Sequence, residues 1–276
     1  MSDRYGGTSS NYDEGNIRYY SRYYSVDPDD YIDEDTYVYA SPDNYIYFNC
    51  SDYDNQSSST CETWRIIGIV DGKVKLIRND SIGEYEWDSD DVTNNWSTST
   101  LNTYLNEDYY NSLNTKNSKT TELISPSIYY LGGYSDSSVY SDQLYIYERT
   151  NSVGTTVLSG NPFTVETNIG LMYGSDHGYA TNFSICNSSL NNYTDSGCGD
   201  YHWMPAEHWL ITPDTSSSQY AWMVNYNGDL SSEPIGGADY GVGQAGWVYP
   251  VLYLDTSVMI KDGDGTSGNP YQLKVS

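Results

Sequence analysis

The chain has 276 residues and a formal net charge of −26, from 38 acidic and 12 basic residues. Such an acidic excess repels phosphate backbones and anionic lipid surfaces, which argues against nucleic-acid binding and against attachment to a membrane surface. No run of residues approaches the ~20 apolar positions of a membrane-spanning helix, so we expect no membrane span in this chain. With 32 tyrosines and 3 phenylalanines, the composition predicts an aromatic and partly wet core.

Residues 1–36 carry almost no aliphatic side chains and combine tyrosine pairs with Gly, Ser and Asp. This composition predicts an acidic, tyrosine-rich extension or linker rather than a folded domain. Tyrosine brings a large contact area at modest entropic cost, so the alternative is that this extension docks on a neighbouring copy of the chain. The candidate inter-subunit residues are Tyr19, Tyr20, Tyr23 and Tyr24.

The pattern changes at residue 37, where we place the start of a domain that runs to residue 276. Strands are expected at 37–39 and 45–48. The apolar runs 62–70 and 73–78 flank Asp71-Gly72, which predicts a β-hairpin with a type I′ turn. Trp96 precedes a helix expected over 97–114, capped by Ser97 or Thr98. Its predicted core-facing residues are Leu101, Tyr104, Leu105, Tyr109 and Leu113.

Shorter elements follow along the chain. Strands are expected within 123–131 and at 169–173, a second helix at 139–149 and a helical turn at 175–180. Three strand-length pieces rich in aromatic and β-branched residues then stand at 209–213, 220–224 and 247–254. A final hairpin is expected from 258–260 and 271–274.

The four cysteines fall in two local pairs. Cys50 and Cys61 enclose ten residues, and Cys186 and Cys198 enclose eleven. Neither pair has metal-binding spacing, so we predict one disulfide across each polar loop and an oxidising, extracellular compartment. No signal peptide opens the sequence, which leaves three alternatives: a lost anchor, a processed product, or exit by another route, as in a phage particle.

The sequence 262–265 contains a D-x-D-G pattern like that of a calcium loop. Asp262 and Asp264 are therefore candidate ligands for Ca²⁺, the one cofactor that the sequence suggests. Gln272 stands where an EF-hand has its Glu, so the favoured alternative is an ordinary Gly/Asp hairpin turn.

Polar loops after residue 213 carry aromatic residues of the kind found in adaptable binding surfaces. The alternative is that these loops are plain solvated connections. The candidate ligand-binding residues are Tyr220, Tyr226, Tyr240 and Trp247.

Several phrases in a fixed order carry a resemblance to a known family. They are CETWRIIGI at 61–69, WS at 96–97, LNTYLN at 101–106, IGLMYGSD at 169–176, WLITP at 209–213, PVLYL at 250–254 and GDGT at 263–266. Over residues 37–275 the chain resembles uncharacterised surface domains of gut Firmicutes and Mollicutes. It is also similar to the C-type-lectin-like fold of formylglycine-generating enzymes and retroelement-diversified variable proteins. The family tends to have Arg before the Pro of its last core strand, and here that residue is Tyr249.

The resemblance does not carry catalytic residues with it. A formylglycine-generating activity would use reactive cysteines, and local pairing favours structural disulfides instead. His202 and His208, with Glu207 between them, lack the spacing of a metal site, and we interpret them as ordinary core or loop residues. We therefore expect no catalysis.

The sequence as a whole predicts an α+β, C-type-lectin-like domain with a mainly antiparallel twisted sheet, one or two helices and long loops. We expect it outside the cell or on its surface, where it binds a protein or glycan ligand in adhesion. The alternative is a structural subunit of an extracellular filament or pilus, whose tail packs on a neighbouring subunit. A third alternative is a trimeric phage receptor-binding protein.

Overall fold

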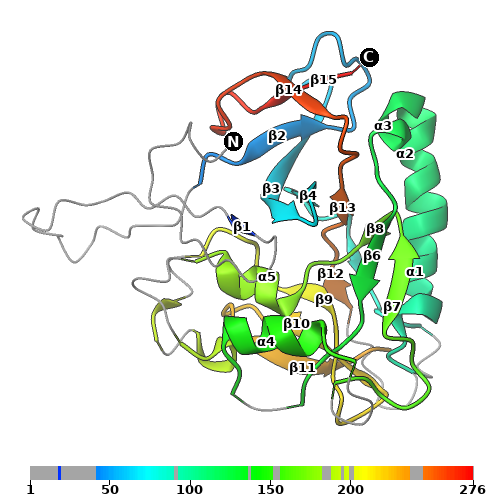
Figure 1. Cartoon of the computed structure of the whole chain (residues 1–276), viewed down its shortest axis with the longest axis vertical. Helices are drawn as coiled ribbons and strands as arrows, with labels where there is room; N and C mark the ends of the chain where they lie inside the picture. Colours follow the sequence, from blue (N-terminus) through cyan, green and yellow to red (C-terminus); the bar gives the residue numbers. More distant parts are fainter. Residues whose placement is uncertain are drawn as a thin grey trace, which may run out of the picture.

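The computed structural model describes residues 18–19, 42–89, 93–135, 138–151, 156–181, 188–193, 196–198, 202–236 and 245–275. These residues form an α+β structure in which most strand pairs are antiparallel, as the sequence predicts (Figure 1). Two larger sheets lie one above the other in that view, with a run of helices along one side. The expected strand at 37–39 lies outside the described residues.

The first sheet has the strand order β1-β3-β4-β13-β8, and β2 also pairs with β3. At its centre is the predicted hairpin, in which Asp71 and Gly72 have φ angles of 49° and 77°. Two consecutive positive φ angles are what a type I′ turn requires, so the hairpin prediction is confirmed. The strands are β1 (Arg18–Tyr19), β2 (Tyr45–Phe48), β3 (Glu62–Val70), β4 (Lys73–Arg78), β8 (Ile169–Gly170) and β13 (Val251–Tyr253).

The second sheet has the order β11-β10-β9-β12-β5. Its central strand β9 is buried along its whole length, and it is antiparallel to β10 and parallel to β12. The strands are β5 (Glu84–Tyr85), β9 (His208–Pro213), β10 (Tyr220–Val224), β11 (Leu230–Pro234) and β12 (Gly246–Trp247).

The helix predicted over 97–114 is a succession of short helical segments. They are η1 (Trp96–Thr98), α1 (Thr100–Tyr104), the π-helical turn η2 (Leu105–Tyr109), α2 (Tyr110–Lys116) and α3 (Ser118–Glu122). The predicted cap is wrong, because Ser99 caps α1 by accepting a hydrogen bond from the backbone N–H of Asn102 at 3.2 Å. Residues 96–98 instead form a separate 3₁₀ turn, capped by Asn95.

The apolar stripe of this helical run is buried as predicted, at Leu101, Leu105 and Leu113. Tyr104 is only partly buried, and its hydroxyl accepts a hydrogen bond from the Tyr85 hydroxyl at 2.9 Å. The helices therefore pack on the body of the domain along the predicted face.

Smaller elements complete the fold. The strand predicted at 169–173 is wrong in length, because only β8 pairs and the chain then enters α5. The hairpin predicted near the C-terminus is confirmed, and its β15 lies beside β2 at the top of Figure 1. These elements are β6 (Ser127–Tyr130), α4 (Ser141–Glu148), β7 (Thr164–Thr167), α5 (Gly174–Tyr179), η3 (Leu190–Asn192), β14 (Met259–Asp262) and β15 (Gln272–Lys274).

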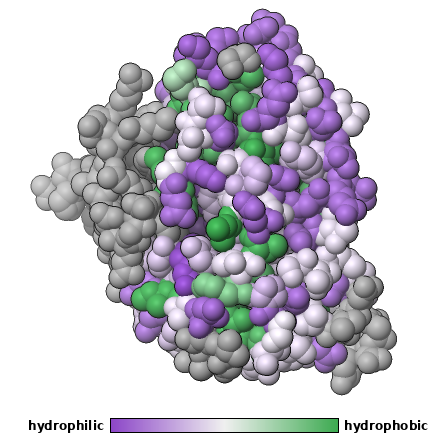
Figure 2. Space-filling view, turned by 45° about the vertical axis from the view of Figure 1, so that its right-hand side comes forward, coloured by the Kyte–Doolittle hydropathy of each residue, from purple (hydrophilic) through white to green (hydrophobic). Residues whose placement is uncertain are grey.

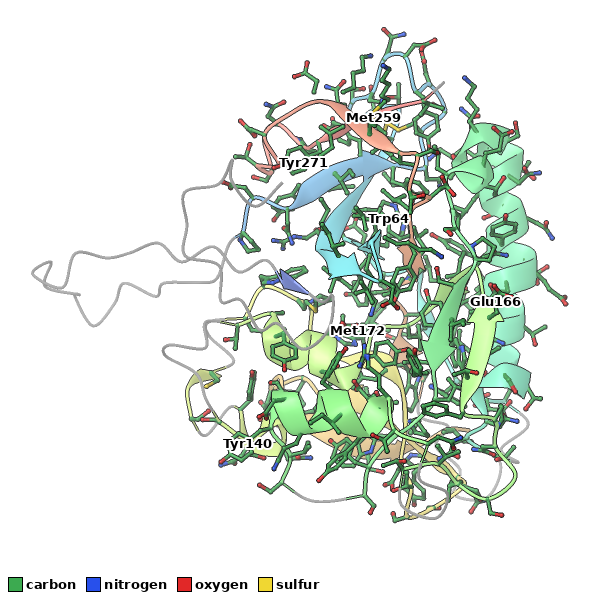
Figure 3. The ribbon with its side chains drawn as sticks, in the orientation of Figure 1. Trp64, Tyr140, Glu166, Met172, Met259 and Tyr271 are labelled. Carbon is green, nitrogen blue, oxygen red and sulfur yellow. A yellow bond between two sulfur atoms is a disulfide. The ribbon has the colours of Figure 1, made fainter. Side chains whose placement is uncertain are left out.

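The core is aromatic, as the composition predicts. Four tryptophans, Trp64, Trp87, Trp96 and Trp209, are at most 1% exposed. Figure 3 shows Trp64 within the upper sheet and Met172 near the middle of the domain. The hydrophobic side chains on the face in Figure 2 form small separate patches among hydrophilic ones. The described residues of that face therefore form no broad apolar interface.

The predicted disulfide between Cys50 and Cys61 is confirmed. The side chain of Asn117 donates a hydrogen bond to the Cys50 carbonyl at 3.0 Å, which ties the disulfide loop to the helical run. Within the described ranges, no helix combines the length and apolar character that crossing a membrane requires.

Candidate functional site

A pocket of about 420 Å³ lies between the β3–β4 turn, β6, α4, the start of α5 and β13. We call it the tyrosine pocket, because four of its lining residues are tyrosines. Its volume falls within the range of small-molecule sites. Its lining residues are Val70, Asp71, Lys73, Ser127, Ile128, Tyr130, Tyr145, Arg149, Tyr173 and Tyr253.

Local sequence explains how these side chains converge. Tyr173 and Tyr253 are buried and form the inner wall, whereas Asp71 and Ile128 are exposed at the rim. The hydroxyl oxygen of Tyr173 accepts a hydrogen bond from the backbone N–H of Tyr130 at 2.7 Å, which fixes its ring against β6. The Tyr173 side chain is therefore held in place without a ligand.

Arg149 follows the last residue of α4 and places a positive charge in the pocket. Its guanidinium carbon lies 3.8 Å from the ring centroid of Tyr145 and 4.6 Å from that of Tyr173. Its Nη1 donates to the Tyr145 carbonyl and to Glu148 Oε2, both at 3.3 Å. Cation–π contacts and hydrogen bonds thus hold the guanidinium in one orientation.

Lys73 supplies the second cation of the pocket. Its Nζ donates to the Pro126 carbonyl at 3.0 Å and to Ser127 Oγ at 3.1 Å. An ammonium group has three N–H donors, so these two bonds leave one donor without a partner among the described residues. Lys73 can therefore donate a hydrogen bond to a bound ligand.

Behind the inner wall lies a buried charged pair, Lys75 on β4 and Asp176 on α5. Neither side chain has any exposed surface. The Lys75 Nζ also lies 4.4 Å from the ring centroid of Tyr173, on the wall of the pocket. Burial lowers the pKa of Lys75, and the neighbouring Asp176 carboxylate opposes that effect.

Glu148 is a second fully buried carboxylate in this region. Its Oε1 accepts hydrogen bonds from the backbone N–H of Ser175 at 3.1 Å and from Thr212 Oγ1 at 3.0 Å, and Ser175 Oγ donates to its Oε2. Burial raises the pKa of Glu148, while Arg149 and Ser175 counter the rise. These bonds tie α4 to α5 and β9, which positions Arg149.

The loop residues proposed for ligand binding do not all lie together. Tyr220 is at one end of β10, opposite Pro234. At the other end of β10, Val224 pairs with His208, and His208 also pairs with Trp247. Tyr226 follows Val224 by two residues, so Tyr226 and Trp247 lie at the same end of the sheet. Tyr226 is the most exposed of them, at 74%. Tyr240 lies outside the described residues, and binding at these positions stays a prediction.

The aspartates of the 262–265 sequence serve the turn between β14 and β15. Asp264 Oδ1 accepts hydrogen bonds from the Thr266 N–H at 3.0 Å and the Thr266 hydroxyl at 2.8 Å. Asp262 Oδ1 accepts from the Gly263 N–H at 2.8 Å. This is the pattern of a self-bonded turn, and the described residues contain no group of three or more His, Cys, Asp or Glu arranged for a metal.

All three histidines of the chain meet in the interior. The ring of His177 on α5 lies 3.8 Å from that of His202 and 6.1 Å from that of His208, between centroids. Sequence reasoning noticed His202 and His208 but missed His177, which is distant in sequence. Burial lowers the pKa of His202 and His208 to about 4, so both are neutral at pH 7. His208 is a core residue, His202 is partly buried beside it, and Glu207 is exposed.

Two predicted features depend on residues outside the described ranges. Cys198 is a buried free cysteine in the structure, and Cys186 is not described, so the second disulfide stays a prediction. In the N-terminal segment, Arg18 pairs with Ile69 and Tyr19 with Gly68, antiparallel to β3. Tyr20, Tyr23 and Tyr24 are not described.

Sequence reasoning missed the tyrosine pocket itself, since its residues come from five separate elements. One signal was present: Lys73 and Lys75 interrupt an apolar hairpin strand in a chain with only 12 basic residues. A scarce cation inside a core strand indicates a buried partner or a site.

Comparison with protein families gives one match, over residues 71–256 of the chain. The matched region includes every lining residue of the tyrosine pocket except Val70. Comparisons with curated proteins and with solved structures give no match. Because the match spans more than half of the chain, this protein belongs to the family described as Domain of unknown function (DUF6273).

Proposed function

We propose that this protein is an extracellular, surface-displayed domain that binds a ligand without catalysing a reaction, and that the tyrosine pocket holds the ligand. The observation that carries the proposal is the preorganised cationic and aromatic lining, in which Arg149 is held between Tyr145 and Tyr173. A site whose groups are fixed in advance loses little entropy on binding. The Cys50–Cys61 disulfide supports an oxidising, extracellular location.

The arrangement of charges favours binding over catalysis. Glu148 is fully enclosed by donors from α5 and β9, and Asp176 is paired with Lys75 behind the wall. Both carboxylates thus serve to position the lining. A C-type-lectin-like fold remains part of this proposal, because long loops on a mainly antiparallel scaffold are common in adhesive domains.

A binding screen with a matched pair of variants tests the location of the site. The purified protein is applied to arrays of glycans and of extracellular-matrix proteins, alongside Tyr145→Ala and Tyr147→Ala. Tyr147 lies on the same helix but is exposed and does not line the pocket. We expect the binding found with the native chain to be lost in Tyr145→Ala and kept in Tyr147→Ala. Binding that instead needs Tyr226 and Trp247 would place the site at the end of the second sheet.

One observation favours the filament alternative, the pairing of Arg18 and Tyr19 with the edge of β3. β2 covers only Glu62 to Arg65 of that edge, and among the described residues the strand that pairs with the stretch beyond it is β1. An edge that pairs with a strand of its own chain can pair with the same strand of a neighbouring copy.

Deletion of residues 1–36 separates the two functions. For a filament subunit, light scattering should detect polymers of the full chain and monomers of the truncated one. Hydrogen exchange at Arg18 and Tyr19 should also be slower in the assembled state than in a free peptide. The same oligomeric state in both chains, with fast exchange in the tail, would reject the filament.

A further inference from the structure

We infer that the tyrosine pocket selects a small monocarboxylate whose body is a six-membered ring. This inference rests on the proposed function and specifies its ligand. The shared chemistry is a single carboxylate on a ring, which both a sugar acid and an aromatic acid provide. The argument has three parts: the charge that the pocket accepts, the shape that it accepts, and the number of charges that the whole chain tolerates.

The pocket disfavours cations, even though tyrosine faces commonly bind them. Cations already occupy these rings: Arg149 is near Tyr145 and Tyr173, and the Lys75 Nζ lies 4.4 Å from the ring centroid of Tyr173. A cationic ligand would have to compete with these cations for the ring faces, and the Lys73 ammonium would repel it.

An anion meets a favourable set of groups. Lys73 has one N–H donor left for a ligand, and its two other bonds to Pro126 and Ser127 fix the ammonium at the pocket edge. The guanidinium of Arg149, which is paired with Glu148 at 3.3 Å, is a second cation in a fixed orientation. Hydrogen bonds between an ammonium and a carboxylate are stronger than neutral ones, so a carboxylate gains more here than an amide of the same shape.

The walls define the body of the ligand. Tyr130, Tyr145, Tyr173 and Tyr253 present flat, amphipathic rings, and Val70 and Ile128 supply the aliphatic contacts. A ring ligand can lay one face on a tyrosine while its polar groups reach hydroxyls. The pocket volume of about 420 Å³ accommodates one or two such rings.

The net charge of the whole chain sets the limit on ligand charge. At −26, the protein repels a polyanion before it reaches the pocket, whereas a ligand with one carboxylate is weakly affected in physiological salt. The negative charge of Asp71 at the rim also repels a polyanion. The pocket is therefore suited to isolated carboxylates rather than to chains of them.

The test uses two acids and their uncharged amides: glucuronate against glucuronamide, and benzoate against benzamide. Binding of each to the full chain is measured by NMR titration at pH 7. We expect at least one acid to bind at least about tenfold more tightly than its amide, as loss of a charged hydrogen bond predicts. Binding of glucuronate but not benzoate identifies the ligand as a sugar acid. Binding of benzoate but not glucuronate identifies it as an aromatic acid.

Two variants connect the preference to the pocket. Lys73→Gln should reduce the preference for the acid, whereas Lys119→Gln, at an exposed lysine on α3, should leave it unchanged. A preserved melting temperature checks that the Lys73 variant is folded. Equal binding of acid and amide, or an acid preference unchanged in Lys73→Gln, overturns the inference, as does a failure of both acids to bind.

The outcomes also separate this inference from the proposed function. If acid and amide bind equally and both lose binding in Tyr145→Ala, the pocket binds ligands but the charge argument is wrong. If an acid binds equally well to Tyr145→Ala, the pocket is not the site and both conclusions fail.

Discussion

Replacement of Lys75 by Met should destabilise the domain more than any surface change of charge. The substitution keeps an unbranched side chain of similar length but removes the charge that faces Asp176, and both side chains are fully buried. The remaining carboxylate keeps the Tyr173 N–H at 2.9 Å as a donor, which compensates its charge only in part. Removing one partner of a buried ion pair costs about 3–5 kcal/mol, and we expect a loss in that range.

Urea unfolding followed by tryptophan fluorescence measures this change, because five of the tryptophans are buried. The double variant Lys75→Met/Asp176→Asn removes both charges and retains an amide oxygen to accept the Tyr173 N–H. It should recover most of the lost free energy of unfolding. Lys119→Met, on the exposed face of α3, is the control and should change stability by less than about 0.5 kcal/mol. If Lys75→Met is as mild as this control, the pair does not have the burial described above.

Three further perturbations test other parts of the fold. Leu105→Ala should lower the free energy of unfolding by about 2–5 kcal/mol, because the side chain is completely buried; an unchanged melting temperature would contradict that placement. The double substitution Cys50→Ser/Cys61→Ser should lower the free energy of unfolding by roughly 2–3 kcal/mol, because it removes a cross-link that restricts the conformational entropy of the unfolded chain. Equal stability of the native and the reduced protein in urea would reject this role. Acid should also destabilise the domain. The pKa of His208 is about 4 in the fold and ~6.5 when unfolded, so its stabilisation is complete above pH 6.5 and falls by about 3 kcal/mol as the pH drops to 4. Urea unfolding at pH 7 and pH 5 should show a smaller dependence on pH in His208→Gln, and an identical dependence would exclude this histidine.

Local signals were enough to predict the hairpin, the buried stripe of the helical run and the disulfide. Asp71-Gly72 determines its own turn, and Leu101, Leu105 and Leu113 repeat at helical spacing. In each case the residues that determine the feature are close together in the sequence, so the local sequence is sufficient to predict it.

The tyrosine pocket could not be predicted in this way, because its chemistry depends on tertiary contacts. Arg149 and Tyr173 are separated by 24 positions in the chain (173 − 149), yet their side chains are in contact. Similarly, nothing in the sequence around His177 indicates that it meets His202 and His208. The wrong helix cap has a local cause, since Ser97, Thr98 and Ser99 are adjacent and equally suited to capping.

The position of β13 determines when the first sheet can form during synthesis. Val251 pairs with Ile77 on one side and with Gly170 on the other, so β13 is the only link between β4 and β8 in the strand order described. Until the ribosome has made residues 251–253, the two halves of this sheet remain separate. Because non-local pairing must wait for its partner, the complete first sheet forms only after residues 251–253 have been synthesised, whereas the local β3–β4 hairpin does not depend on them.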